Sequence, residues 1–94
     1  MVGARLILLL SLAGCAGDPY RWEYVGPDRS AKTIGPIFVT ESTLASVCKS
    51  KSAFGCISCT KTDCVIYILD GMNKSWTRYA VEHEWKHAKG WIHN

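Results

Sequence analysis

The sequence lacks several features that mark large classes of proteins. Its 94 residues carry 11 basic and 8 acidic side chains, and the lysines are scattered rather than gathered in a tract. Because a basic stripe is typical of nucleic-acid-binding proteins, nucleic acid is not an expected partner. Internal repeats and low-complexity segments are also missing. A chain of this length forms at most one domain, with a small core.

The chain also has no apolar run long enough to cross a bilayer as a helix. Its most apolar stretch, residues 6–12, follows Arg5 and precedes small residues, which predicts a secretory signal peptide over residues 1–14. Residues 12–15, Leu-Ala-Gly-Cys, resemble the bacterial lipobox. That resemblance implies cleavage before Cys15 and attachment of a lipid to its sulfur. An ordinary signal peptide or a core helix near the start of the chain is the alternative.

A lipid on Cys15 would anchor the protein in a bilayer of the bacterial cell envelope, on the periplasmic face. Ala16, rather than an aspartate, follows the lipidated position, and the lipoprotein resemblance then favours the outer membrane of a Gram-negative cell. Residues 15–33 are rich in turn-forming residues and predict a tether. Three aromatic residues alternate within the tether: Tyr20, Trp22 and Tyr24. They fit either a short edge strand or aromatic contacts at a membrane surface.

The chain has an odd number of cysteines, five. With Cys15 acylated, four of the five cysteines remain: Cys48, Cys56, Cys59 and Cys64. In an exported protein they predict two structural disulfides, with three possible connectivities. A zinc site of four thiolates is less favoured, since only one C-x-x-C pair is present. A redox C-x-x-C pair normally opens a helix, whereas Ile57 and Ser58 are expected in a loop.

The middle of the chain predicts a strand, a short helix and a second strand. Residues 36–40 are β-branched and aromatic and predict the first strand. Residues 41–49 have apolar side chains at helical spacing and predict a helix capped by Thr40 or Ser42. The strongest strand prediction is residues 64–69, six apolar residues that end at a turn.

A final helix, capped by Asn73 or Ser75, is expected to run to about Lys89. Three of its residues share an apolar stripe that we expect against the sheet: Val81, Trp85 and Ala88. Ala80 is expected on a different face of the helix.

The chain has only three histidines, and all fall between residues 83 and 93, in the pattern H-E-x-x-H-x-x-G-x-x-H. Residues four apart on a helix lie on one face, so His83 and His87 can aim at one metal ion. Gly90 tolerates a positive φ and can therefore end the helix and reverse the chain. The reversal would bring His93 back as a third ligand.

Three protein ligands with one open position are typical of a catalytic zinc site, so one Zn²⁺ is the expected cofactor. Glu84 follows His83 on the helix, close enough to reach a metal-bound water without being a ligand. Glu84 is therefore the candidate catalytic residue, as a general base. The alternative is a solvated, histidine-rich helix end that binds no metal.

The pattern resembles that of the metzincin zinc peptidases. By position, the resemblance implies that His83, His87 and His93 bind zinc, that Glu84 polarises the attacking water, and that Gly90 forms the turn.

The same resemblance implies an edge strand ahead of the helix, against which an extended peptide binds; residues 64–69 fit that role. One departure is clear. In metzincins a methionine-containing turn follows the third histidine, whereas both methionines here, Met1 and Met72, precede the motif. Outside the last thirty residues there is a looser resemblance to small metallopeptidase lipoproteins of bacterial mobile elements.

Together these features predict an α+β domain over residues 34–94, with a small antiparallel sheet, a short helix and a C-terminal metal-binding helix. Disulfides would staple this minimal zincin-like fold. The expected function is a membrane-anchored zinc metallopeptidase that hydrolyses an envelope peptide bond, in a protein or in a peptidoglycan crosslink. A non-catalytic zinc-binding or interaction lipoprotein of the envelope, for instance of a mobile element or secretion system, is the alternative. An envelope protein partner would fit either function.

Overall fold

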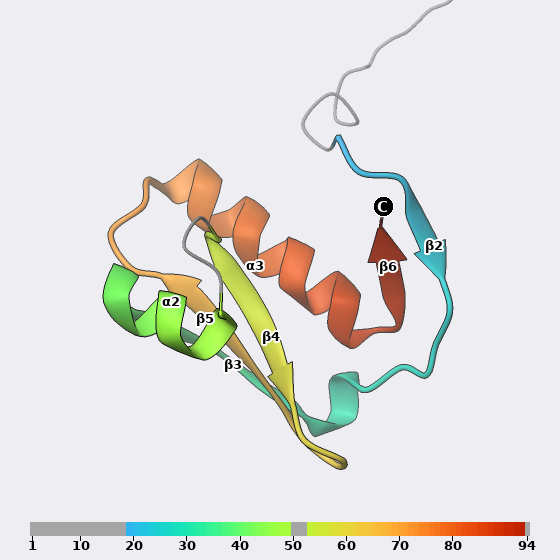
Figure 1. Cartoon of the computed structure of the whole chain (residues 1–94). Coiled ribbons are helices and arrows are strands. Elements are labelled where there is room, and N and C mark those ends of the chain that lie inside the picture. Colours follow the sequence, from blue (N-terminus) through green and yellow to red (C-terminus); the bar gives the residue numbers. More distant parts are fainter. Residues whose placement is uncertain (1–18, 50–52, 94) are drawn as a thin grey trace, which may run out of the picture.

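The computed structural model describes residues 19–49 and 53–93 (Figure 1). The elements, in chain order, are β2 (Trp22–Tyr24), a 3₁₀ turn (Ser30–Lys32), β3 (Thr33–Val39), α2 (Glu41–Cys48), β4 (Gly55–Cys59), β5 (Cys64–Leu69), α3 (Lys74–Ala88) and β6 (Trp91–His93). The predicted α+β class is confirmed. Neither helix in the described ranges has the length and hydropathy needed to span a bilayer. The predicted signal peptide and Cys15 lie outside the described residues.

The main sheet has three strands in the order β3–β5–β4. The predicted strand over residues 64–69 is confirmed as β5, at the centre of this sheet. β5 is antiparallel to β4 but parallel to β3, so this sheet is mixed and the prediction of a small antiparallel sheet is confirmed only in part, for the β4–β5 and β2–β6 pairs. The parallel pairing follows from the connection between β3 and β5. α2 and β4 lie between them in the chain and return it to the start of the sheet, so that β5 runs in the same direction as β3.

β4 is a strand that the sequence did not predict, since Ile57 and Ser58 were expected in a loop. Apart from Ile57, its residues are glycine, serine and cysteine, which do not favour a strand strongly. Pairing with β5 over five residues and two disulfides hold it in place instead.

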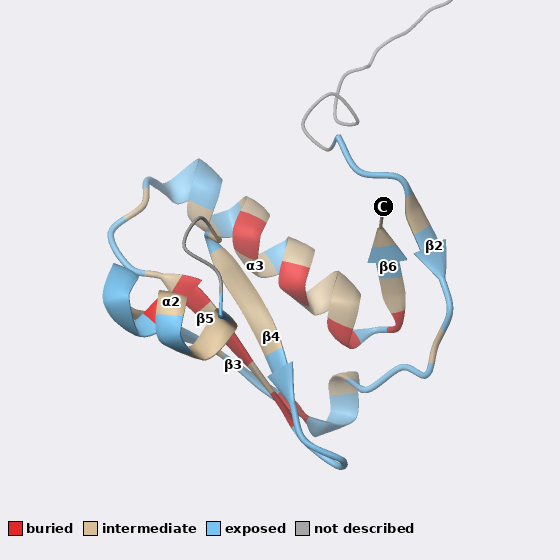
Figure 2. Ribbon diagram, viewed as in Figure 1, coloured by how far each residue is buried: buried red, intermediate tan, exposed pale blue. Residues whose placement is uncertain are grey.

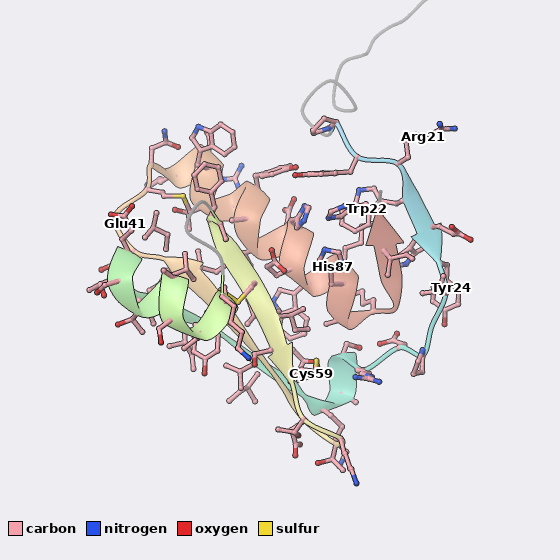
Figure 3. The ribbon with its side chains drawn as sticks, in the orientation of Figure 1. Arg21, Trp22, Tyr24, Glu41, Cys59 and His87 are labelled. Carbon is pink, nitrogen blue, oxygen red and sulfur yellow. A yellow bond between two sulfur atoms is a disulfide. The ribbon has the colours of Figure 1, made fainter. Side chains whose placement is uncertain are left out.

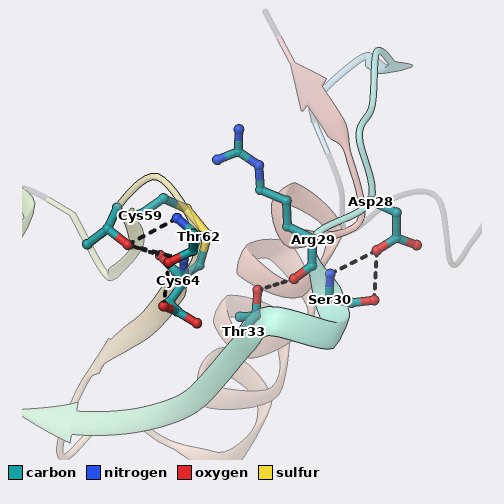
Figure 4. The surroundings of a disulfide bond; sticks show 9 residues. Asp28, Arg29, Ser30, Thr33, Cys59, Thr62 and Cys64 are labelled. Carbon is teal, nitrogen blue, oxygen red and sulfur yellow. Dashed lines mark hydrogen bonds between the residues drawn. A yellow bond between two sulfur atoms is a disulfide. The ribbon is translucent and has the colours of Figure 1, made fainter.

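The four cysteines predicted to form disulfides are all paired, Cys48 with Cys56 and Cys59 with Cys64. The first bridge ties the end of α2 to β4. The second, between Cys59 and Cys64, closes the β4–β5 hairpin (Figure 4). In the turn of this hairpin the Thr60 amide donates to the Asp63 carbonyl. The structure thus selects one of the three connectivities that the sequence left open.

The core lies between α3 and the face of the sheet that carries Ile66 and Ile68, both fully buried (Figure 2). Four half-buried side chains complete it: Ile57, Met72, Val81 and Trp85. Ala80 belongs to this core as well, which corrects its placement on another face of the helix. The buried residues of α3 are Ala80, Glu84 and Ala88, each four positions apart. Two small alanines let the helix lie close to the sheet, and Glu84 is buried between them.

Both helices begin as predicted with a side-chain cap. Thr40 Oγ1 accepts from the Thr43 amide, and Asn73 Oδ1 accepts from the Trp76 amide. α3 ends at Ala88, one residue before the predicted end.

The segment assigned to a tether takes part in the fold. β2 pairs antiparallel with β6, and Trp22 lies opposite His93. The amides of Val25 and Gly26 both donate to the carbonyl of Gly90, and the Arg29 amide donates to the carbonyl of Ala88. The bond to Ala88 satisfies a carbonyl left unpaired at the C-terminal end of α3, and the two bonds to Gly90 hold the turn that follows the helix. The folded part of the described chain therefore begins well before residue 34.

Candidate metal centre

Three histidines converge where α3 meets β6. α3 presents His83 and His87, and β6 returns His93 beside them. One ring nitrogen from each lies within 4.8 Å of the other two, and the Nε2 atoms of His83 and His93 are 3.2 Å apart. Among the described residues these three form the one such group, and they lie close enough to hold a single metal ion. The predicted return of His93 to the side of His83 and His87 is thus confirmed, and β6 is the strand that brings it there.

The His87 ring is oriented by the backbone. Its Nδ1 lies 3.0 Å from the carbonyl oxygen of Trp91, so Nδ1–H donates and Nε2 keeps its lone pair. Burial lowers the pKa of His87, and the nearby charge of His93 acts in the same direction, against the hydrogen bond to Trp91. The neutral imidazole, which is the form that binds a metal, is therefore favoured.

Gly90 makes the reversal between α3 and β6. Its φ is +102°, and its amide donates to the His87 carbonyl. A Cβ at this position would lie 2.8 Å from the Cα of Gly26, so a side chain would push the N-terminal segment away. Gly90 is thus needed twice, for its backbone angle and for the close approach of the segment beside it.

Glu84 is buried, with 7% of its surface exposed. Burial raises the pKa of its carboxyl group to about 7. The side chain packs over β4, since a Cβ built on Gly55 would lie 3.6 Å from Glu84 Cγ. Glu84 is therefore held between the helix and the sheet, beside the histidines but outside their group of converging nitrogens.

A cleft of about 620 Å³ opens over this cluster. All three histidines and Glu84 line it, together with residues of β4 and aromatic or apolar side chains such as Tyr20, Phe54 and Tyr79. The candidate metal ligands, the carboxyl group of Glu84 with its raised pKa, and the edge of β4 thus all face the same cleft.

The strand along this cleft is β4. The expectation that residues 64–69 form the exposed edge is wrong, because β5 is paired on both sides. The unpredicted β4 lies between β5 and the cleft. The Leu69 amide donates to the Phe54 carbonyl, so by antiparallel alternation Gly55 and Ile57 direct their backbone groups away from β5. Both residues line the cleft.

Sequence reasoning missed two aromatic residues at the cluster. The ring of Tyr20 lies 4.0 Å from that of His93, measured between centroids, and Trp22 lies about 5 Å from each of the three imidazoles. Figure 3 shows Trp22 reaching from β2 into the space between that strand and α3, whereas Arg21 points away. The alternation of aromatic residues indicated a strand, but nothing local indicated its partner.

Comparison with models of known protein families, with curated proteins and with solved structures found no match. The functional assignment therefore depends on the geometry of the site itself.

Proposed function

We propose that this protein is a zinc metallopeptidase of the bacterial envelope, with a minimal zincin-like domain. The observation that carries the proposal is the convergence of His83, His87 and His93 in a cleft that also holds Glu84. Three imidazoles suit Zn²⁺, and three protein ligands leave a position for water or substrate. The resemblance of the motif to metzincins supports the same reading.

The chemistry that zinc supplies when bound is polarisation of a carbonyl and a lower pKa for the coordinated water. The protein's own residues would do the rest. Glu84, with its pKa raised to about 7, is suited to take a proton near neutral pH and pass it to the leaving amine. Its burial over Gly55 keeps the carboxyl group at the cleft wall.

An extended peptide is the substrate form that the cleft favours. The outward backbone groups of Gly55 and Ile57 can pair with such a chain by strand addition. Apolar side chains of Phe54 and Tyr79 would contact its side chains. Envelope proteins and peptidoglycan crosslinks both contain peptide bonds that such a cleft could accept.

Lipidation of Cys15 would keep the site at the bilayer. Tyr20 lies five positions after Cys15, and a chain of that length spans at most about 18 Å. The substrate would then be a molecule near the membrane surface. Replacing Cys15 with alanine should release the protein from the membrane fraction or stall its processing; a processed Cys15→Ala protein that still partitions to membranes would rule out this anchor.

A non-catalytic zinc-binding lipoprotein is the second candidate. The ring of Tyr20 lies against His83 and His93 on the cleft side, and this contact favours a covered site over an open one.

The test compares wild type with Glu84→Gln, which keeps the three histidines, and with Glu82→Gln, an exposed neighbour on the same helix. All three proteins should bind one equivalent of zinc. Wild type and Glu82→Gln should cleave peptides in envelope extracts, and Glu84→Gln should not. Identical peptide patterns from wild type and Glu84→Gln, with zinc bound, would favour the non-catalytic protein. A wild-type protein that binds no zinc would rule out both the peptidase and the non-catalytic zinc-binding protein.

A further inference from the structure

The indole of Trp22 contacts every histidine of the cluster. Its centroid lies 5.0 Å from that of His83, 5.2 Å from that of His87 and 4.9 Å from that of His93. The three imidazole planes are inclined to the indole by 58–88°, so none of them stacks flat on it. One apolar ring thus limits the tilt of all three candidate ligands.

Trp22 contacts the histidines from outside the cleft. The residues that line the cleft include the three histidines but not Trp22. Trp22 instead lines a separate hollow with Arg21 and Glu23. The histidines therefore contact both the cleft and an indole that does not line it.

Two other contacts keep the indole in place. β2 pairs with β6 so that Trp22 lies directly opposite His93, which ties the ring to the strand that carries the third ligand. Lys86, one position before His87 on α3, places its Nζ 4.7 Å from the Trp22 ring and 5.1 Å from the Trp91 ring. A cation over both indoles holds the β2–β6 pair against the helix.

We propose that Trp22 is a positioning residue of the metal centre: it covers the histidines from outside the cleft and aligns the three imidazoles for one metal ion. An apolar shell of this kind excludes water from one side of a metal site. The open coordination position is then directed to the cleft. Residues of the N-terminal segment therefore complete a site whose ligands all come from the C-terminal end. The inference depends on the proposed binding of a metal by the three histidines.

The experiment measures the affinity of the purified protein for Co²⁺ and Zn²⁺, and the visible absorption of the Co²⁺ form. Trp22→Thr keeps strand propensity but removes the ring, and Trp22→Phe keeps an aromatic ring. Tyr24→Thr is the matched control, because Tyr24 lies on the same strand and contacts Trp91 rather than a histidine. Circular dichroism and intact disulfides report on folding; if Trp22→Thr does not fold, Trp22→Leu takes its place with the same expectation.

Trp22→Thr should weaken metal binding by about 10- to 100-fold, the usual effect of removing a group that supports a metal ligand. Its Co²⁺ absorption should change as water gains access to the metal. Trp22→Phe should restore most of the affinity and the wild-type spectrum. Tyr24→Thr should change the affinity by no more than about twofold, as for an ordinary surface substitution. Lys86→Met, which frees the indole without altering β2, should shift the Co²⁺ spectrum in the same direction as Trp22→Thr, but less.

Two results would overturn the inference alone. One is a wild-type protein that binds the metal while Trp22→Thr binds it equally well with an unchanged spectrum. The other is an equal loss in Trp22→Thr and Tyr24→Thr, which would show a general effect of β2 pairing. A wild-type protein that binds neither metal would instead remove the proposed function, and the inference with it.

Discussion

The two halves of this molecule are held together in different ways. One, the sheet half, consists of β3, α2, β4 and β5; the other, the histidine half, consists of β2, the C-terminal half of α3, and β6. The largest fully buried side chains all belong to the sheet half: Leu44, Cys64, Ile66 and Ile68. Both disulfides belong to it too. In the histidine half, backbone bonds and aromatic contacts to imidazoles take the place of a core.

This difference indicates where each half obtains its stability. Apolar burial and crosslinks stabilise the sheet half whether or not a ligand is present. The histidine half instead gathers three imidazoles and a carboxyl group whose ionised form is unfavourable because it is buried. Metal binding would turn that arrangement into a source of folding free energy.

The largest expected effect is therefore that of zinc on the histidine half. At a free zinc concentration 1,000 times the dissociation constant, the free energy of unfolding should rise by about 4 kcal/mol. Hydrogen exchange should slow mainly in β2, β6 and the end of α3. His87→Ala removes one of the three ligands and should abolish the zinc effect, whereas Glu82→Ala, on the exposed face of the same helix, should preserve it. Equal zinc protection in wild type and His87→Ala would contradict the assignment of the site.

The next largest effect is expected from removing a disulfide of the sheet half. Removing the Cys48–Cys56 bridge with a Cys48→Ala, Cys56→Ala double variant should lower the free energy of unfolding by about 2–3 kcal/mol, because the bridge closes a short loop. Urea denaturation measures this loss. Zinc affinity, measured on the folded variant by competition with a chelator, should stay close to that of the wild type. If affinity falls along with stability, the two halves are not independent.

The smallest effect concerns Glu84 in protein kept free of metal by a chelator. Its folded pKa of about 7 lies above the ordinary value of 4.5, so the folded state binds the proton more tightly than the unfolded state does. Glu84 therefore costs stability as the pH rises from about 4.5 to 7, and the full cost remains above pH 7. Glu84→Gln should be more stable than wild type by roughly 1–2 kcal/mol at pH 8.

At pH 4.5 the two proteins should melt at nearly the same temperature. The two proteins differ only at position 84, so the difference between their melting temperatures isolates the carboxyl group of Glu84. A wild type that is as stable as Glu84→Gln at both pH values would show that the carboxyl group is hydrated rather than buried.

The elements that were predicted correctly are those that short sequence patterns specify. Six apolar residues in a row identified β5, and Thr40 and Asn73 marked the starts of the two helices. β4 was missed because Ile57 is its only strongly strand-favouring residue, and pairing and disulfides impose its conformation. The exposed edge was then assigned to β5 rather than to β4, since strand order depends on contacts that no short segment encodes.

By itself, the sequence determined the parts of the site that follow from helical spacing and backbone freedom. His83 and His87 share a helix face because they are four residues apart, and Gly90 can reverse the chain because it has no Cβ. Only the tertiary structure decided what surrounds them. Burial of Glu84, the cleft beside β4 and the contact of Trp22 with all three imidazoles each join segments far apart in the chain. Such contacts result from packing and strand pairing across the whole domain, which local sequence patterns do not specify.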